Sequence, residues 1–322
     1  MATTTEIPEA MRAAAIDRFG AVESVRVEVL PVPKLGAHDV LVEVATAGIG
    51  AWDPEMIDGT FQVGKAHFPQ VFGSDGAGTI RAIGGNVTRC AVGDRVYGWG
   101  FGNSKGGFYA EYAAVDEELV VKIPDTVGLE AAGALAVDGV TALLGLEHLE
   151  LAPGDAVMIF GASGGVGHLA VQLAKRMGLK VFAVASKPDG VALVEQLGAD
   201  TVVDGHRSFQ TAARDLAPNG YAGAIAFAGG NGWKEALELV QRGGRVAWPN
   251  GVEPSPIAPH GTKTIPYDAD VSAEILGRLN DLVARSPFRV HVSRFYSLDD
   301  TVQALKDVRK HHLGKLALKI HA

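Results

Sequence analysis

Residues 156–186 read AVMIFGASGGVGHLAVQLAKRMGLKVFAVAS. The nearly continuous apolar run at 156–161 is typical of a parallel strand that is buried on both faces. A glycine-rich turn follows at 161–167, and apolar residues then recur at the spacing of a helix. Gly178 marks the expected end of that helix, and 180–185 is apolar again. The order predicts a strand, a tight turn, a helix and a second strand.

Three glycines of the turn have separate expected roles. Gly161 permits the sharp exit from the strand, Gly164 lets the backbone approach a pyrophosphate, and Gly167 lets the helix pack closely on the sheet. The N–H groups of the first helical turn and the helix dipole then bind the anion. Because strand, turn, helix and second strand arrive in the order that this motif requires, the stretch predicts a dinucleotide site.

The end of the second strand decides which dinucleotide is expected. An NAD site has Asp or Glu about 20 residues beyond the glycines, whereas a 2′-phosphate requires donors and positive charge. Ser186 and Lys187 stand at this position, and Arg207 follows the third strand. NADPH is therefore the expected cofactor. A solvated loop charge is the alternative interpretation of Lys187, and the nearby Asp189 argues for it.

Composition narrows the class of protein. The 322 residues suffice for two domains, and 47% hydrophobic with 20% charged residues is ordinary for a globular chain. The net charge of -8 has no long runs, so no nucleic-acid or anionic-membrane partner is expected. No apolar run reaches the length of a membrane span and the first residues lack the apolar core of a secretory signal, which predicts a cytoplasmic protein.

The region from Met11 to about Val127 has short apolar runs that are broken by Gly, Pro and Asp. This pattern predicts an all-β, barrel-like domain. The predicted strands are Ala13–Ile16, Val25–Val29, Val40–Val44, Ala77–Ile83, Arg95–Tyr97, Tyr109–Val115 and Leu119–Ile123.

The rest of the chain predicts an α/β domain with a doubly wound parallel sheet. The chain becomes helical from Leu129 to Leu149, and strands alternate with helices beyond the glycine-rich unit. The ligand of such a sheet lies at the carboxyl ends of its strands. Further strands are predicted at 201–203, 224–228, 245–248, 289–292 and 315–320, and further helices near 208–216, 233–241, 271–284 and 298–308.

Motifs along nearly the whole chain resemble the medium-chain dehydrogenase/reductase superfamily, in particular its zinc-free quinone oxidoreductase branch. Besides the glycine-rich turn, they are FGSDGAG at 72–78, VGDRVYG at 92–98, GGFYAEY at 106–112, GVTA at 139–142 and GKL at 314–316. The resemblance implies a GroES-like β-barrel domain formed by residues 1–127 with 268–322, and a Rossmann domain at 128–267. It also implies a homodimer and a small electrophilic substrate.

The cysteine content indicates whether the protein can bind zinc. Zinc-dependent members of the superfamily place a cysteine ligand in the segment that reads AGIGAWD here, at 47–53, and carry four clustered cysteines for a structural metal. This chain has only Cys90, so no metal site is expected. His67 and the adjacent His311 and His312 are expected to be plain surface residues. Without a Lewis acid, hydride transfer from NADPH to a quinone or an α,β-unsaturated carbonyl is the expected reaction.

The expected substrate cleft departs from the zinc-free branch, whose usual Asn, Tyr and Arg are replaced by Gly50, Glu55 and Ile57. Trp52 and Asp53 are the catalytic candidates. Trp52 is either a wall against a flat substrate or a core residue, and Asp53 either positions the loop, relays a proton or caps the helix-like segment after Pro54. Further candidates for the pocket are Phe61, Phe101 and Tyr109.

The expected cofactor contacts combine the motif with the resemblance. They are Thr141, Ala162, Ser163, Gly164, Gly165, Val166, Ser186, Lys187, His206, Arg207, Phe227 and Asn250. Relatives often place a Tyr over the adenosine after the third strand, and His206 or Arg207 is the candidate to substitute for it here. Two other functions stay open: a zinc-free alcohol dehydrogenase, and a protein that binds NADPH without turnover. The loss of the polar residues in the substrate cleft motivates the second.

Overall fold

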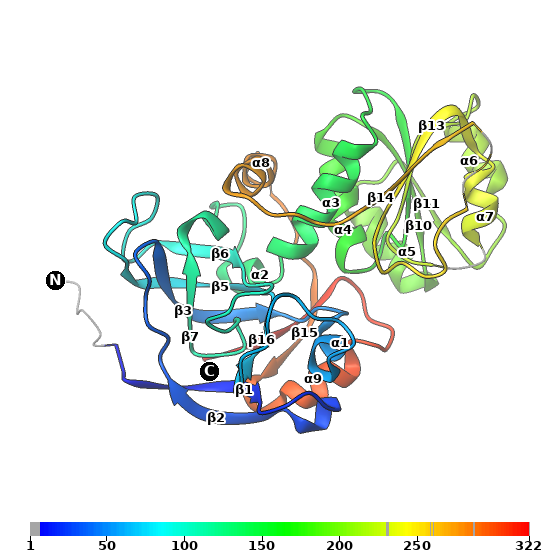
Figure 1. Cartoon of the computed structure of the whole chain (residues 1–322). Helices are drawn as coiled ribbons and strands as arrows, with labels where there is room; N and C mark the ends of the chain where they lie inside the picture. The colour runs from blue at the N-terminus through cyan, green and yellow to red at the C-terminus, as the bar shows by residue number, and fades with distance from the viewer. Residues whose placement is uncertain (1–6, 230–231, 258, 260, 286, 322) are drawn as a thin grey trace. The chain divides into compact units, whose positions relative to one another are not determined.

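The computed structural model describes residues 7–229, 232–257, 259, 261–285 and 287–321, which form two compact units (Figure 1). Unit 1 contains the chain up to residue 137, residues 271–280 and the chain from 292. Unit 2 contains residues 138–270 and 281–291. Compared with the predicted domains, the structure thus assigns 128–137 to unit 1 and 268–270 and 281–291 to unit 2. Within the described residues, none of the helices has the length and apolar character that a bilayer crossing requires.

Unit 1 is built on a sheet of seven strands in the order β15-β16-β3-β5-β6-β8, with β7 also paired to β3, and a second sheet in the order β2-β1-β4. It has the GroES-like β fold that the sequence predicts. The strands are β1 (Ala10–Ile16), β2 (Arg26–Pro31), β3 (Asp39–Gly48), β4 (Gln70–Val71), β5 (Asp75–Ile83), β6 (Arg95–Trp99), β7 (Tyr112–Asp116), β8 (Val120–Lys122), β15 (Val292–Ser297) and β16 (Lys315–Lys319).

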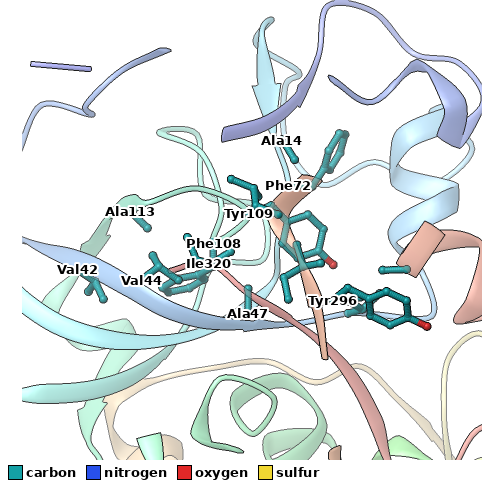
Figure 2. Packing of buried hydrophobic residues seen from close by; sticks show 14 of the residues in the cluster. Ala14, Val42, Val44, Ala47, Phe72, Phe108, Tyr109, Ala113, Tyr296 and Ile320 are labelled. Carbon is teal, nitrogen blue, oxygen red and sulfur yellow. The ribbon is translucent and has the colours of Figure 1, made fainter. Parts of the chain in front are cut away.

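Strand β3 organises the core of unit 1 because both of its faces are covered. Val40, Val42 and Val44 are fully buried in one cluster, whereas Leu41 joins a second cluster. Figure 2 shows the first cluster, to which Phe108 and Tyr109 contribute buried rings. The unit also contains the helices α1 (Asp53–Asp58), α2 (Leu129–Ala132) and α9 (Thr301–Asp307), and the 3-10 turns η1 (Val22–Ser24), η2 (Glu117–Leu119) and η3 (Leu298–Asp300).

Unit 2 contains one parallel sheet of six strands in the order β11-β10-β9-β12-β13-β14. Strand β9 pairs with β10 on one side and with β12 on the other, so the winding reverses there, as in a Rossmann sheet. The strands are β9 (Ala156–Phe160), β10 (Lys180–Ala185), β11 (Thr201–Asp204), β12 (Tyr221–Ala226), β13 (Val240–Pro249) and β14 (Lys263–Tyr267).

Helices follow these strands as the alternating pattern predicts. Those within unit 2 are α4 (Gly165–Arg176), α5 (Lys187–Gln196), α6 (Gln210–Leu216) and α7 (Gly232–Leu237). The single helical region predicted up to Leu149 is instead divided into α2 and α3 (Ala136–His148). The predicted helix near 271–284 is α8 (Ala273–Ala284).

One predicted strand begins later than expected, and one strand was missed, each for an identifiable reason. The strand predicted at 289–292 is β15, which begins at Val292, because side chains of α4 satisfy the preceding backbone. Gln172 accepts the N–H of Arg289 at 2.9 Å and donates to its carbonyl at 2.9 Å. Strand β14 was missed because Pro266 interrupts the pattern; it is the edge strand of its sheet, where a missing N–H is tolerated.

Candidate active site

The glycine-rich turn of unit 2 leads from β9 into α4. Gly161 has φ 77°, in the left-handed region that favours glycine, and its N–H and that of Ala162 donate to the carbonyl of Val184 at 3.1 and 3.0 Å. Gly164 is the N-cap of α4, and no side chain makes a capping hydrogen bond there. The N–H groups that begin α4 therefore point to the carboxyl edge of the sheet, where they suit a phosphate.

Two glycines of this turn differ in the space around them. A Cβ on Gly167 would lie 2.1 Å from the carbonyl oxygen of Gly161 and 2.8 Å from the Cα of Ala162, so the helix packs directly on the turn. A Cβ on Gly164 would meet only that carbonyl oxygen, at 3.4 Å, an ordinary contact. Gly164 also has φ −83°, which any residue adopts. Packing within the protein therefore explains why residue 167 is a glycine, but it does not explain the glycine at 164.

The predicted 2′-phosphate contacts lie at the ends of β10 and β11. Ser186 is the N-cap of α5 and makes no capping hydrogen bond with its side chain. Lys187 is exposed and has φ 61°. Arg207 is also exposed, whereas His206 is paired through Nδ1 with Asp204 at 2.9 Å. Hydrogen bonds from His206 hold the pKa of the Asp204 carboxyl below its ordinary value.

The remaining predicted contacts are placed differently. Phe227 follows β12 and donates its N–H to Phe160 at 3.0 Å, and Asn250 follows β13 and donates its amide to Asp268 at 2.9 Å. Both therefore lie at the carboxyl edge of the sheet with the turn. Thr141 lies in α3, where it is nearly buried and its carbonyl accepts the hydroxyl of Tyr267 at 2.8 Å. The edge as a whole fits a dinucleotide: an open glycine at a helix start, with two basic side chains beyond it.

In unit 1, the Trp52 side chain occupies the space in front of Gly50. A Cβ on Gly50 would lie 2.5 Å from Trp52 Cε2 and 2.7 Å from its Nε1. The indole Nε1 donates to Ser74 Oγ at 3.0 Å, and the half-buried ring packs against the main core cluster of the unit. Trp52 is therefore both a packed residue and part of the wall beside Gly50.

Asp53 is fully buried and fastens the loop that precedes α1. Its Oδ2 accepts the N–H of Gly50 at 2.8 Å and the hydroxyl of Tyr109. Burial, with the Asp53 carboxylate next, raises the pKa of Tyr109 well above its ordinary value. The N-cap of α1 is Trp52 and no side chain caps it, so the interpretation of Asp53 as a helix cap was wrong. Its contacts are those of a loop-positioning residue.

Trp52 belongs to a cluster of four aromatic rings that is centred on Phe101. The Phe101 ring centroid lies 6.0 Å from that of Trp52, 5.7 Å from Phe61 and 6.0 Å from Trp99. The sequence interpretation named Phe61 and Phe101 but missed Trp99, which is the last residue of β6. Residues two apart in a strand lie on the same face, so the available signal was that Trp99 shares a face with Tyr97.

A buried ion pair that the sequence interpretation missed lies beside Trp52. Lys315 Nζ is 3.7 Å from Asp75 Oδ2, and the two side chains are 4% and 1% exposed. Asp75 Oδ1 also accepts the N–H of Val137 at 2.5 Å. Lys315 Nζ lies 5.7 Å from the centre of the Trp52 ring, within cation–π range. Both residues belong to motifs that carried the family resemblance, but their pairing spans most of the chain.

Comparison with known proteins defines the family. The model described as "Alcohol dehydrogenase GroES-like domain" matches residues 36–125, and that of "Zinc-binding dehydrogenase" matches 165–253. An alcohol dehydrogenase of Rhizobium meliloti (strain 1021) is 30% identical over 297 residues, covering 84% of this chain and 86% of that protein. The quinone oxidoreductase of Homo sapiens is 32% identical over 243 residues, covering 73% and 72%.

Solved structures agree with this result. A quinone oxidoreductase from Coxiella burnetii superposes with a TM-score of 0.82 at 25% identity, over 97% of this chain and 100% of that one. An NAD-dependent alcohol dehydrogenase superposes with a TM-score of 0.86 at 25% identity, over the same shares. The chain therefore belongs to the medium-chain dehydrogenase/reductase superfamily. It is an oxidoreductase with an NAD(P)-binding fold.

The residues of segment 47–53 do not fit the zinc that one of these family descriptions implies. The indole of Trp52 fills the volume that a side chain at Gly50 would need. The only cysteine of the sequence, Cys90, lies outside this segment, and burial raises the pKa of its thiol, which disfavours a metal-binding thiolate. Among the described residues no group of three His, Cys, Asp or Glu is arranged to hold a metal ion.

Proposed function

We propose that the protein is an NADPH-dependent reductase that transfers hydride to a quinone or an α,β-unsaturated carbonyl without zinc. The observation that carries the proposal is the Trp52 indole in front of Gly50. It leaves a wall of packed rings where zinc-dependent relatives have a metal ligand. Hydride delivery to an activated double bond requires positioning more than Lewis-acid chemistry.

The carboxyl edge of the Rossmann sheet supports NADPH as the cofactor. Strand β10 ends at Ala185, and the next residues are Ser186 and the exposed Lys187 rather than a carboxylate that would bind a ribose 2′-OH. Arg207 adds a second exposed cation after β11. The bound NADPH would supply the hydride. The residues of this chain bind its phosphates and orient it: the start of α4 the pyrophosphate, and Lys187 with Arg207 the 2′-phosphate.

The substrate side of the reaction is proposed to use the rings around Trp52. Asp53 fixes the loop through Gly50 and Tyr109, so the Trp52 ring is held in one position. A flat substrate packs against such a wall with little loss of conformational freedom. We further propose, from the family resemblance, that the protein works as a homodimer, which sedimentation of the purified protein tests.

Alcohol oxidation is the second candidate, because relatives such as the Rhizobium meliloti protein are named alcohol dehydrogenases. The deciding experiment is oxidation of NADPH and NADH against small quinones, enones, aldehydes and ketones, with simple alcohols tested in the reverse direction. We expect turnover of quinones or enones with NADPH. Oxidation of alcohols with no reaction on enones would replace the proposal, and tight NADPH binding with silence across the panel would support a binding protein without turnover.

A further inference from the structure

Unit 1 contains a cavity of about 230 Å³ that the proposed reaction does not use. Its walls come from β1, β2, the segment 69–74 and the loop 100–107. A cavity of about 150 Å³ is enough to admit benzene. The space is therefore large enough for one ring with substituents, and too small for a dinucleotide.

One side of the cavity is apolar. Met56, Val63 and Phe72 line it. Val63 is 38% exposed, whereas Met56 and Phe72 are buried. Ligand pockets are lined predominantly by apolar side chains, which contact the apolar part of the ligand. The ligand therefore has an apolar body.

The charge of the lining is positive. Lys65, His67 and Lys105 line the cavity, and no Asp or Glu is among the described residues that do so. Lys105 is neutralised by Asp39. Neither Lys65 nor His67 makes a hydrogen bond or an ion pair with any part of the chain that the structure describes. An anionic group on the ligand would give these two side chains a partner.

A third polar group lacks a partner at the same place. Gln70 lines the cavity, and its Oε1 is buried without a hydrogen-bond partner among the described residues. A buried polar atom in this state costs about 1–3 kcal/mol. The terminal torsion of a glutamine is broad, so the amide can turn toward the cavity and accept a hydrogen bond from a ligand. The ligand therefore carries a donor besides its anion.

We propose that this cavity binds a small carboxylate with a ring-sized apolar body and a hydroxyl group. The carboxylate pairs with Lys65 and His67, the ring covers Val63 and Met56, and the hydroxyl donates to Gln70. The site is formed by residues of unit 1 alone. It stands whether or not the proposed reductase activity does.

Calorimetric titration of the full chain without cofactor tests the site with three probes. They are 4-hydroxybenzoate, benzoate, which lacks the donor, and 4-hydroxybenzyl alcohol, which lacks the charge. We expect 4-hydroxybenzoate to bind most tightly and the uncharged alcohol to bind at least about tenfold more weakly. Absence of saturable binding of 4-hydroxybenzoate would overturn the proposal, as would equal affinity for all three probes.

Substitutions of the lining residues test which side chains contact the ligand. Replacing both donors, Lys65→Gln with His67→Asn, should weaken the binding of both carboxylates at least about tenfold and leave that of the alcohol unchanged. Gln70→Leu should remove the advantage of 4-hydroxybenzoate over benzoate. Lys234→Gln, an exposed lysine of unit 2, is the matched control and should change nothing. Undiminished carboxylate binding in the double variant would show that the cavity does not select an anion through these side chains.

Discussion

Replacing Gly164 with valine should abolish cofactor binding and leave the fold intact. A Cβ at this position meets its nearest neighbour, the Gly161 carbonyl oxygen, at 3.4 Å, and φ is −83°. The protein therefore tolerates a side chain here, with a stability change within about 1 kcal/mol. A pyrophosphate at the start of α4 does not tolerate it, because the added methyl groups occupy the space over the N–H donors.

The size of the loss follows from the contacts removed. Each hydrogen bond from a backbone N–H to a charged phosphate is worth about 1.5–3 kcal/mol. Losing two of them costs at least about 3 kcal/mol, which weakens binding by more than about 100-fold. Titration of NADPH measures the affinity, and urea unfolding measures the stability of the same variant.

Gly167→Ala is the matched variant with the opposite expectation. Its Cβ would lie 2.1 Å from the Gly161 carbonyl oxygen and 2.8 Å from Ala162 Cα, so α4 has to move away from the turn. Overpacking of this kind costs about 1–3 kcal/mol of stability. Unchanged NADPH affinity in Gly164→Val would refute the location of the pyrophosphate, and a fully stable Gly167→Ala would refute the packing argument.

Three further predictions concern charged groups. Lys187→Ala should weaken NADPH binding about tenfold or more and leave NADH binding unchanged. Lys180→Ala, at the opposite end of β10, is the control. Equal losses for both cofactors would contradict a role of Lys187 in binding the 2′-phosphate. Burial lowers the pKa of His168 from 6.5 to about 4, so its contribution to stability is complete above pH 6.5 and is lost as the pH falls to about 4. The free energy of unfolding lost over this pH range is about 3 kcal/mol. Urea unfolding of His168→Leu should lack this part of the pH dependence. Superimposable stability–pH profiles of the variant and the unmodified protein would contradict the prediction. Lys315→Met should destabilise the protein by about 3 kcal/mol, because it removes the cation that pairs with the buried Asp75. Combining it with Asp75→Leu should restore most of the lost stability. A stable single variant would show that the pair contributes little.

Local patterns account for the parts of the fold that the sequence predicted well. The unit β9-α4-β10 combines an apolar run, a glycine-rich turn and helical spacing within thirty residues, so each signal supports the next. Seven of the twelve predicted cofactor residues lie in this unit's turn or directly after its second strand, which a parallel sheet brings to one edge.

Contacts between distant segments were beyond the sequence pattern. Lys315 and Asp75 meet because β16 and β5 both pair with β3, and no local periodicity records which strands become neighbours. The position of Trp52 in front of Gly50 depends on the Asp53 contacts that close the loop, which sequence reasoning had left among several alternatives. Predicting strand β14 would have required knowing that it lies at the edge of its sheet, since Pro266 argues against a central strand.

The most direct test of the central claim is the rate of NADPH oxidation by a small quinone or enone after exhaustive chelation, with the metal content of the same sample measured by elemental analysis. We expect kcat/KM to be unchanged in protein that contains far less than one zinc per chain, because Trp52 fills the space beside Gly50. Loss of activity on chelation, with recovery when zinc is restored, would contradict a zinc-independent reductase.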